Sequence, residues 1–122
     1  MRWCRGRLRL CTLLILFWAL PALAQPAVAI SALVQHPDQY DGKTVSVTGT
    51  ITGYREHVSA RGNPYTTFRL VDGGAVSVFI WKHQGLRDGI RVRVIGTFSK
   101  VRRVGRYTFF NEIEARRIEV VH

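Results

Sequence analysis

The chain has little cysteine, and what it has lies near one end. Both cysteines, Cys4 and Cys11, precede residue 12 of 122. The rest of the sequence therefore has no thiol for a disulfide and no thiolate ligand for a structural zinc site. This excludes a disulfide-stapled secreted scaffold and the common zinc-finger classes, so the folded part must be stabilised by its hydrophobic core.

Acidic residues are also few. The sequence has 8 Asp and Glu against 18 Lys and Arg, a formal net charge of +10 at pH 7. A positive balance suits anionic partners such as nucleic acid, anionic glycans or lipid head groups, but it does not choose among them and also serves solubility. We find no internal repeat, low-complexity tract or second domain in the sequence, and the length fits one domain.

The N-terminus has the three parts of a secretory signal peptide. A basic stretch ends at Arg9, an apolar run over residues 10–20 is too short to span a bilayer, and Ala22-Leu23-Ala24 supplies a small-x-small cleavage site. We expect cleavage after Ala24 and a periplasmic or secreted bacterial protein with no transmembrane segment; an uncleaved anchor is the alternative. Residues 25–37 are then a short helical lead-in, and residues 38–122 the folded domain.

The first elements can be assigned from the hydrophobic period. Ile30, Leu33 and Val34 have helical spacing, which predicts a short helix that ends at Pro37 and leads into a turn over residues 37–42. From residue 43 the period changes to two, which predicts a strand. Because Gly49 and Gly53 interrupt it, we expect this first strand to be long and strongly curved.

Residues 65–81 predict a β-hairpin around Asp72-Gly73-Gly74, where glycine supplies the positive φ that a tight turn requires. One set of alternating residues is expected to face the core: Thr66, Phe68, Leu70, Val76, Val78 and Ile80. Phe79 and Trp81 then lie on the outer face, beside Tyr65 and Arg69 of the neighbouring strand. The alternative is that these rings pack beneath the N-terminal helix or in a homodimer contact.

The remaining segments predict three loops and two further strands. Polar loops are expected over residues 56–64 and 99–105, and a linker that holds one helical turn over residues 82–89. Alternation over residues 90–98 and again from residue 107 predicts strands. The fold class is therefore all-β, a small closed or nearly closed five-stranded barrel with a short N-terminal helix.

Two motifs carry a resemblance to a known fold. They are Asp41-Gly42-Lys43-Thr44-Val45-Ser46-Val47-Thr48-Gly49-Thr50-Ile51 and Tyr65-Thr66-Thr67-Phe68-Arg69-Leu70-Val71-Asp72. With the order of elements over about residues 38–121, they resemble the OB-fold, specifically its anticodon-binding-like branch and the small exported bacterial OB-fold proteins. The resemblance implies a binding face over the second and third strands, flanked by the loops that join strands one to two and four to five.

Cations and aromatic rings fill that face. The predicted ligand-binding residues are Arg61, Tyr65, Arg69, Phe79, Trp81, Lys100, Arg102, Arg103 and Arg106. Proteins that bind single strands combine a basic groove with rings that stack on bases. We therefore expect a non-enzymatic protein that binds single-stranded nucleic acid or another anionic polymer, with steep salt dependence and little sequence preference.

Each of these features has a plainer interpretation. The basic loops can be solvated faces, and Tyr54, Tyr65 and Tyr107 can cap a barrel end with the hydroxyl in water. The alternative function is an envelope or stress-response module that uses the same face for a protein, a glycan or a small anionic ligand. The sequence does not determine the oligomeric state.

Residues suited to catalysis are scarce. The segment Arg69-Leu70-Val71-Asp72-Gly73 resembles the strand that carries a metal-binding aspartate in staphylococcal-type nucleases, but Gly74-Ala75 stands where a second acidic residue is needed. The later Asp-x-Pro-Glu element of those nucleases is absent. The four histidines lack metal-ligand spacing. We therefore expect no catalytic site, no metal site and no cofactor.

Glu112 and Glu114 are the remaining candidates for a reactive pair. Two residues apart on a predicted strand, they would project from one face, as a divalent-cation pair or a glycosidase dyad would. Arg116 and Arg117 follow closely in the sequence. Their proximity favours a solvated charge cluster in which the arginines neutralise the carboxylates.

Overall fold

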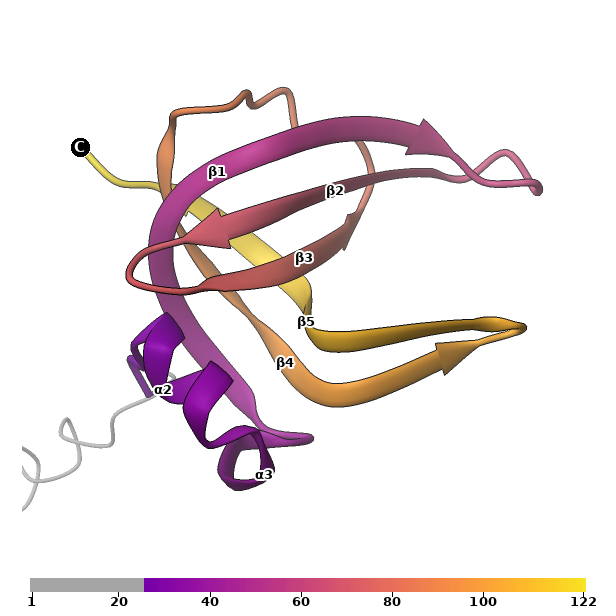
Figure 1. Ribbon diagram of the computed structural model, residues 1–122. Coiled ribbons are helices and arrows are strands. Elements are labelled where there is room, and N and C mark those ends of the chain that lie inside the picture. Colours follow the sequence, from indigo (N-terminus) through magenta and orange to yellow (C-terminus); the bar gives the residue numbers. More distant parts are fainter. Residues whose placement is uncertain (1–25) are drawn as a thin grey trace, which may run out of the picture.

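Residues 26–122 are described by a computed structural model (Figure 1). The predicted signal peptide, residues 1–24, lies outside the described residues. The elements in chain order are α2 (Ile30–Gln35), α3 (Pro37–Tyr40), β1 (Thr44–Val58), β2 (Pro64–Val71), β3 (Ala75–Trp81), β4 (Arg91–Val104) and β5 (Tyr107–Val120). Within residues 26–122, no helix is long and apolar enough to cross a membrane.

The five strands form a closed barrel in the order β1-β2-β3-β5-β4. All neighbouring pairs are antiparallel except β3 with β5, which pair in parallel over Ser77–Phe79 and Glu112–Glu114. β1 closes the barrel because its first half pairs with β4 and its second half with β2. The all-β five-stranded barrel and the short N-terminal helix predicted from the sequence are both confirmed.

The core follows the period-two alternation. The six residues assigned to the inner face of β2 and β3 are all buried. Thr66 is the polar member of this set, and its hydroxyl donates a 2.8 Å hydrogen bond to the Lys82 carbonyl, which satisfies the buried group. α2 adds Ile30 and Leu33 to the core and lies against one end of the barrel (Figure 1).

Two glycines allow β1 to bend as predicted. At Gly49 a Cβ atom would lie 2.9 Å from Leu70 Cγ, so only glycine fits this approach without displacement. Gly53 has a φ of 63° and lies where the register with β2 shifts between Thr52 and Arg55. Such a bulge increases local twist, and it lies just beyond Thr50, where the pairing of β1 changes from β4 to β2.

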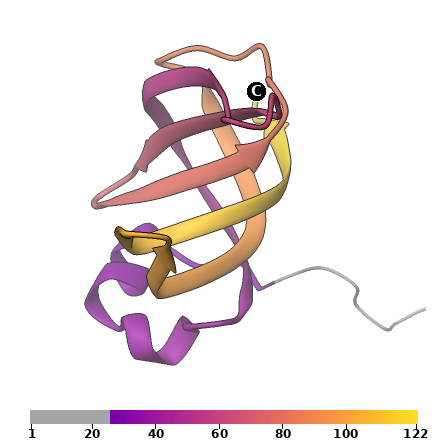
Figure 2. The same cartoon turned by 90° about the vertical axis from the view of Figure 1, so that its right-hand side faces the viewer.

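Two hairpin arms extend beyond the barrel on the same side (Figures 1 and 2). We call residues 55–67 the β1–β2 arm and residues 99–111 the β4–β5 arm. The predicted loops 56–64 and 99–105 are wrong in extent, because β1 continues to Val58 and β4 to Val104. Antiparallel pairing provides hydrogen-bond partners for the backbone N–H and C=O groups whatever the side chains are. The strands therefore continue through segments whose side chains are polar or basic.

Two smaller expectations also differ from the structure. Pro37 does not lead directly into a turn but begins α3, since proline suits the first turn of a helix, whose N–H groups have no helical partner. The linker over residues 82–89 contains no helical turn. Side-chain hydrogen bonds hold it instead.

Tyr54 and Glu56 anchor this linker to β1. The Tyr54 hydroxyl donates to Glu56 Oε2 at 2.7 Å and accepts from the Leu86 N–H at 3.1 Å, and the Gly85 N–H donates to the same carboxylate oxygen at 3.0 Å. The Tyr54 hydroxyl, followed by the Gly85 N–H, lowers the pKa of Glu56 from its ordinary value of 4.5. The linker that follows Trp81 is thereby fixed to the barrel wall.

The variant Tyr54→Phe tests this anchor. Because the pKa of Glu56 is lower in the folded state, its carboxylate stabilises the fold above pH 4.5, and this contribution is lost as the pH falls through the lowered pKa. We expect the variant to be less stable than the unmodified protein at neutral pH, with a difference that shrinks in acid. Urea unfolding at several pH values measures it; a difference that is constant with pH would contradict the assignment.

Candidate functional site

A groove lies between the two arms, over the outer face of β2 and β3. It has a volume of about 420 Å³ and is lined by His57, Tyr65, Thr67, Phe79, Trp81, Arg102, Val104, Tyr107, Phe109 and Glu112. Its lining is mostly aromatic, and it has the size of a small-ligand site. The two arms form the sides of the groove, because residues of both arms line it together with residues of β3.

Aromatic rings form a continuous row along one wall. His57 stacks on Tyr65 with ring centroids 4.7 Å apart, Tyr65 stacks on Phe79 at 5.3 Å, and the Phe79 ring meets Trp81 edge-on at 5.0 Å. The row follows from register, since His57 is opposite Tyr65 and Tyr65 is opposite Trp81 on adjacent strands. His57 Nε2 also lies 2.9 Å from the hydroxyl oxygen of Thr67.

The aromatic side chains of the groove differ in their exposure to solvent. Trp81 is 48% exposed, Tyr107 62% and Phe109 39%. Phe79 is half-buried, and the Arg102 guanidinium carbon lies 5.2 Å from its ring centroid. The face available to a ligand is therefore made by Trp81, Tyr107 and Phe109, while Phe79 supports it from beneath.

Tyr107 and Phe109 were missed as groove residues by the sequence reasoning. They lie opposite Val104 and Arg102 in the β4–β5 register, so the four side chains share one face of the arm. The signal that would have found them is the alternation Tyr107, Phe109 beside a predicted binding loop. Treating residues 99–105 as a loop hid the pairing.

Arg102 is the predicted cation that the structure brings into the groove. Its guanidinium donates a hydrogen bond through Nη1 to Glu112 Oε1, and Nη2 lies 3.9 Å from Glu114 Oε1. The expectation that Arg116 and Arg117 neutralise these carboxylates is wrong: Arg117 pairs with Glu119 at 3.2 Å. The cation that does so comes from the other strand of the arm.

Two predicted cations are directed elsewhere. Lys100 Nζ lies 2.7 Å from Asp38 Oδ1 of α3, a hydrogen bond that raises the pKa of Lys100. Arg103 follows Arg102 on a strand and so projects from the opposite face of the arm. Neither residue lines the groove.

The other predicted cations surround the groove without lining it. Arg61 lies in the turn at the tip of the β1–β2 arm, and Arg106 in the turn of the β4–β5 arm, with its guanidinium carbon 6.0 Å from the Tyr107 ring centroid. Arg69 is exposed on the outer face of β2, opposite Ser77 of β3.

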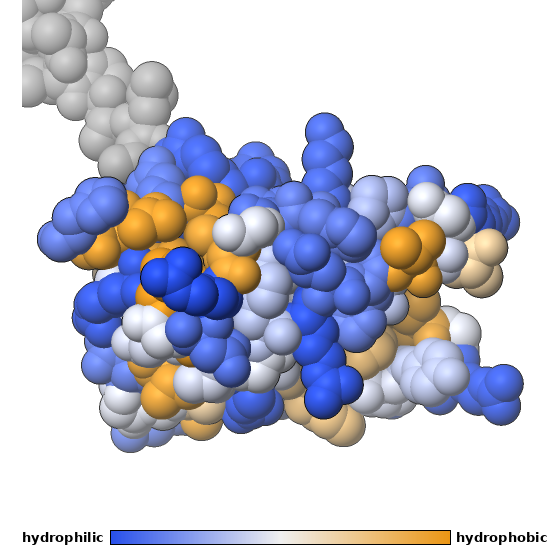
Figure 3. All heavy atoms as spheres, turned by 90° about the horizontal axis from the view of Figure 1, so that it is seen from above, coloured by the Kyte–Doolittle hydropathy of each residue, from blue (hydrophilic) through white to orange (hydrophobic). Residues whose placement is uncertain are grey.

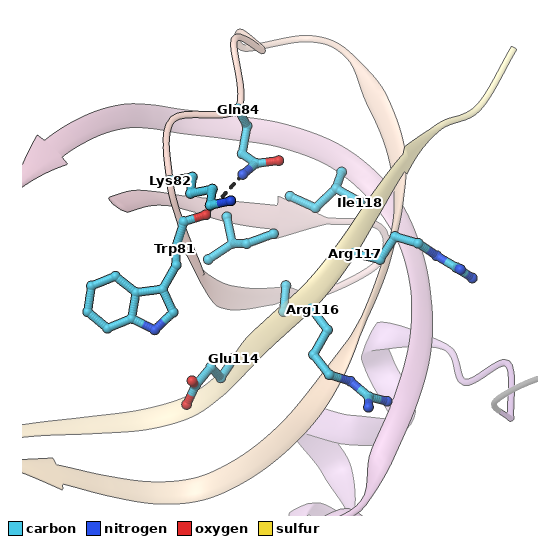
Figure 4. A pocket seen from close by; sticks show the side chains of 9 residues that line it. Trp81, Lys82, Gln84, Glu114, Arg116, Arg117 and Ile118 are labelled. Carbon is cyan, nitrogen blue, oxygen red and sulfur yellow. Dashed lines mark hydrogen bonds between the residues drawn. The ribbon is translucent and has the colours of Figure 1, made fainter. Parts of the chain in front are cut away.

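A second cavity of about 510 Å³ adjoins the groove at Trp81. It lies between the end of β3 and the second half of β5, beyond their short parallel pairing, and we call it the seam pocket. Its lining includes three cations, Lys82, Arg116 and Arg117, and one acidic residue, Glu114. In Figure 4 the indole of Trp81 and the side chain of Glu114 point to one side, and Arg117 points to the other. Trp81 thus joins an aromatic groove to a cationic pocket.

Features of a metal centre are not found in the described part of the chain. Across residues 26–122, no three His, Cys, Asp or Glu side chains group in a way that could hold a metal ion. His83 makes structural contacts instead, with Nε2 2.8 Å from the His57 carbonyl oxygen.

Seen from above, the surface is largely hydrophilic, with its apolar residues in separate patches (Figure 3).

Comparison with solved structures identifies the fold. The chain is similar to the yeast Stn1 and Ten1 structure, with a TM-score of 0.64 and 11% identity over 82% of this chain and 64% of that one. The fold is the OB-fold. A Leishmania major Friedlin protein assigned as an aspartyl-tRNA synthetase matches with a TM-score of 0.61 and 16% identity, over 83% of this chain and 21% of that chain.

These similarities establish the fold alone. The chain spans only about a fifth of the synthetase and under two thirds of the yeast chain. No protein-family model matches the sequence, and no curated protein is similar to it.

Proposed function

We propose that this protein binds single-stranded nucleic acid in the groove between its two arms, without catalysing a reaction. The observation that carries the proposal is the set of exposed rings, Trp81, Tyr107 and Phe109, on a groove that the OB-fold places between two hairpin arms. Every base has a face that can stack on such rings. Cations around the groove would contact the phosphates.

The arrangement of charges supports a strand that enters along the arms and leaves over the seam pocket. Arg61 and Arg106 are at the tips of the two arms, and Arg69 lies on the outer face of β2. Lys82 and Arg116 line the seam pocket. Bases would lie in the groove, whose walls are mostly aromatic, with the phosphates outside it. One of the similar structures is that of a tRNA-charging enzyme, which agrees with a nucleic-acid partner.

Titration of a fluorescently labelled oligothymidylate tests the proposal. The OB-fold binds roughly 4–16 nucleotides, so a strand of about 12 is suitable. With three to four phosphates neutralised, we expect the logarithm of the association constant to fall with the logarithm of salt concentration at a slope of about −2 to −3. Absence of binding at low salt, or binding that ignores salt, would contradict the proposal.

Charge removal gives a matched comparison. The double variant Arg61→Gln with Arg106→Gln removes cations at the tips of the arms, and we expect weaker binding and a salt slope shallower by about 1.4, since each single-strand contact contributes about 0.7. Lys100→Gln with Arg103→Gln removes the same charge from a lysine that pairs with Asp38 and from an arginine on the opposite face of the β4–β5 arm. An equal loss in both variants would show a nonspecific charge effect.

We also propose that residues 1–24 direct export and are removed after Ala24. The support is the basic, apolar and small-residue sequence of that segment. Expression of the full chain in a bacterium, followed by mass measurement of the protein in the periplasmic fraction, tests it. A mass that retains residues 1–24 would contradict cleavage.

A second candidate function, binding of a protein partner, is favoured by the outer face of the β4–β5 arm. Val101 and Phe110 form a cross-strand pair there, 39% and 66% exposed. Light scattering during size-exclusion chromatography distinguishes self-association through this face from a monomer.

A further inference from the structure

A carboxylate forms part of the groove. Glu112 is the one acidic residue among those that line it, and its side chain is only 8% exposed. A carboxylate opposes the approach of a phosphate. A groove made only to hold a polyanion would not place one here, so the ligand group that approaches Glu112 must offer hydrogen-bond donors.

Arg102 is held by that carboxylate. Its Nη1 donates to Glu112 Oε1, its Nη2 lies 3.9 Å from Glu114 Oε1, and its guanidinium carbon is 5.2 Å from the Phe79 ring centroid. Glu112 therefore neutralises the one cation that lines the groove. The pair can recognise a neutral group by hydrogen bonds but contributes little to phosphate binding.

The backbone of Asn111 brings the pair together. Asn111 has a φ of 51°, a left-handed conformation that asparagine tolerates better than most residues. It interrupts the alternation of β5 at the point where the β4–β5 arm leaves the barrel. As a result Arg102, from the inner face of the arm, reaches Glu112 beside the outer face of β3.

The pair has a defined order of donors and acceptors. Arg102 supplies N–H donors, Glu112 Oε1 is an acceptor already engaged by Arg102, and among residues 26–122 no hydrogen bond reaches Oε2. The order donor, acceptor, acceptor is also that of the Watson–Crick edge of cytosine, whose partner guanine offers the acceptor O6 and then the donors N1–H and N2–H₂.

We propose that Arg102 and Glu112 read the Watson–Crick edge of guanine in a bound single strand. The inference rests on the proposed function. Arg102 donates to O6, and the Glu112 carboxylate accepts from N1–H and the 2-amino group. Thymine places a carbonyl oxygen where guanine has its 2-amino group, which the carboxylate repels. Adenine presents its 6-amino donor to Arg102 and the acceptor N1 to the carboxylate, so neither contact forms. The groove therefore prefers guanine, which general stacking does not predict.

Substitution at one base tests the inference atom by atom. Labelled strands of about six nucleotides, thymidines except for one central position, are titrated with the full-length protein. We expect the strand with central dG to bind about tenfold more tightly than all-thymidine, since a good bidentate contact discriminates by about that factor. Deoxyinosine, which lacks only the 2-amino group, should lie between them. Strands that bind within twofold of one another would overturn the inference.

Variants of the two glutamates assign the preference to its residue. Glu112→Gln is expected to reduce the preference for dG to within about twofold. It should also steepen the salt slope by about 0.7, because Arg102 becomes free to contact a phosphate. The change in slope reports the release of Arg102 from the ion pair, and the loss of the preference reports the loss of the guanine contact. Glu114→Gln removes the same charge from an exposed residue near Arg102 and should keep the preference.

The outcomes separate the two proposals. If no strand binds, the proposed function fails, and this inference fails with it. If the strands bind but the unmodified protein does not distinguish dG from dI and dT, only the guanine inference is overturned. Retention of the preference in folded Glu112→Gln also overturns it. If that variant does not fold, the comparison of dG, dI and dT on the unmodified protein decides.

Discussion

Replacing Gly96 with alanine is expected to lower the free energy of unfolding by about 3 kcal/mol or more. A Cβ at this position would lie 2.2 Å from the Glu114 carbonyl oxygen and 2.6 Å from the Ala115 Cα. Both are backbone atoms of the paired strand β5, so no side-chain rotation relieves the clash. β4 and β5 would have to separate at the register shift between Ile95 and Gly96.

Urea unfolding followed by circular dichroism measures the effect, with Gly74→Ala as the control. Gly74 also has no positive φ, and the nearest atom to its Cβ would be 3.5 Å away, an ordinary contact. We expect this variant to be unchanged or more stable by up to about 1 kcal/mol, since alanine restricts the unfolded chain. Similar losses at the two positions would show that contact with the β5 backbone is not the cause.

The position of Gly96 links stability to the groove. It lies on β4 just before Phe98, whose side chain is fully buried, and the same strand then continues into the β4–β5 arm. A variant that folds with β4 and β5 displaced would misplace Arg102 relative to Glu112. Such a variant should lose the preference for guanine more than its general affinity for single strands.

The barrel could be predicted because its signals are local. Alternation with period two separates Phe68 and Leu70 from Arg69, and Asp72-Gly73-Gly74 specifies a tight turn. These patterns require no knowledge of distant residues. They predicted the five strands, the inner face of the β2–β3 hairpin and the curvature of β1 correctly.

The groove could be predicted only in part because it depends on pairing between distant segments. Trp81 was assigned to the outer face from its own strand, but the partner of Glu112 lies ten residues earlier, across a hairpin whose extent the basic sequence concealed. The left-handed backbone of Asn111 then changes which face the arm presents. Alternation along one strand carries no information about either feature, so Arg116 and Arg117 were wrongly chosen as the neutralising cations.

Removal of the exposed rings should have the largest effect on binding. Stacking contributes on the order of 1–3 kcal/mol per base, so Trp81→Ala and Tyr107→Ala are each expected to weaken single-strand binding about tenfold to a hundredfold. Because Trp81 is 48% and Tyr107 62% exposed, the free energy of unfolding should change by less than about 1 kcal/mol. Fluorescence anisotropy with a labelled oligothymidylate and urea unfolding measure the two quantities.

Two further variants show whether the loss belongs to the groove. Phe110→Ala removes a ring of 66% exposure from the opposite face of the same strand, and it should leave affinity unchanged. Phe79→Ala should weaken binding and also destabilise the fold, because Tyr65, Trp81 and Arg102 all pack on its ring. If Phe110→Ala weakens binding as much as Tyr107→Ala, the strand does not lie in the groove, and the outer face of the β4–β5 arm becomes the interface.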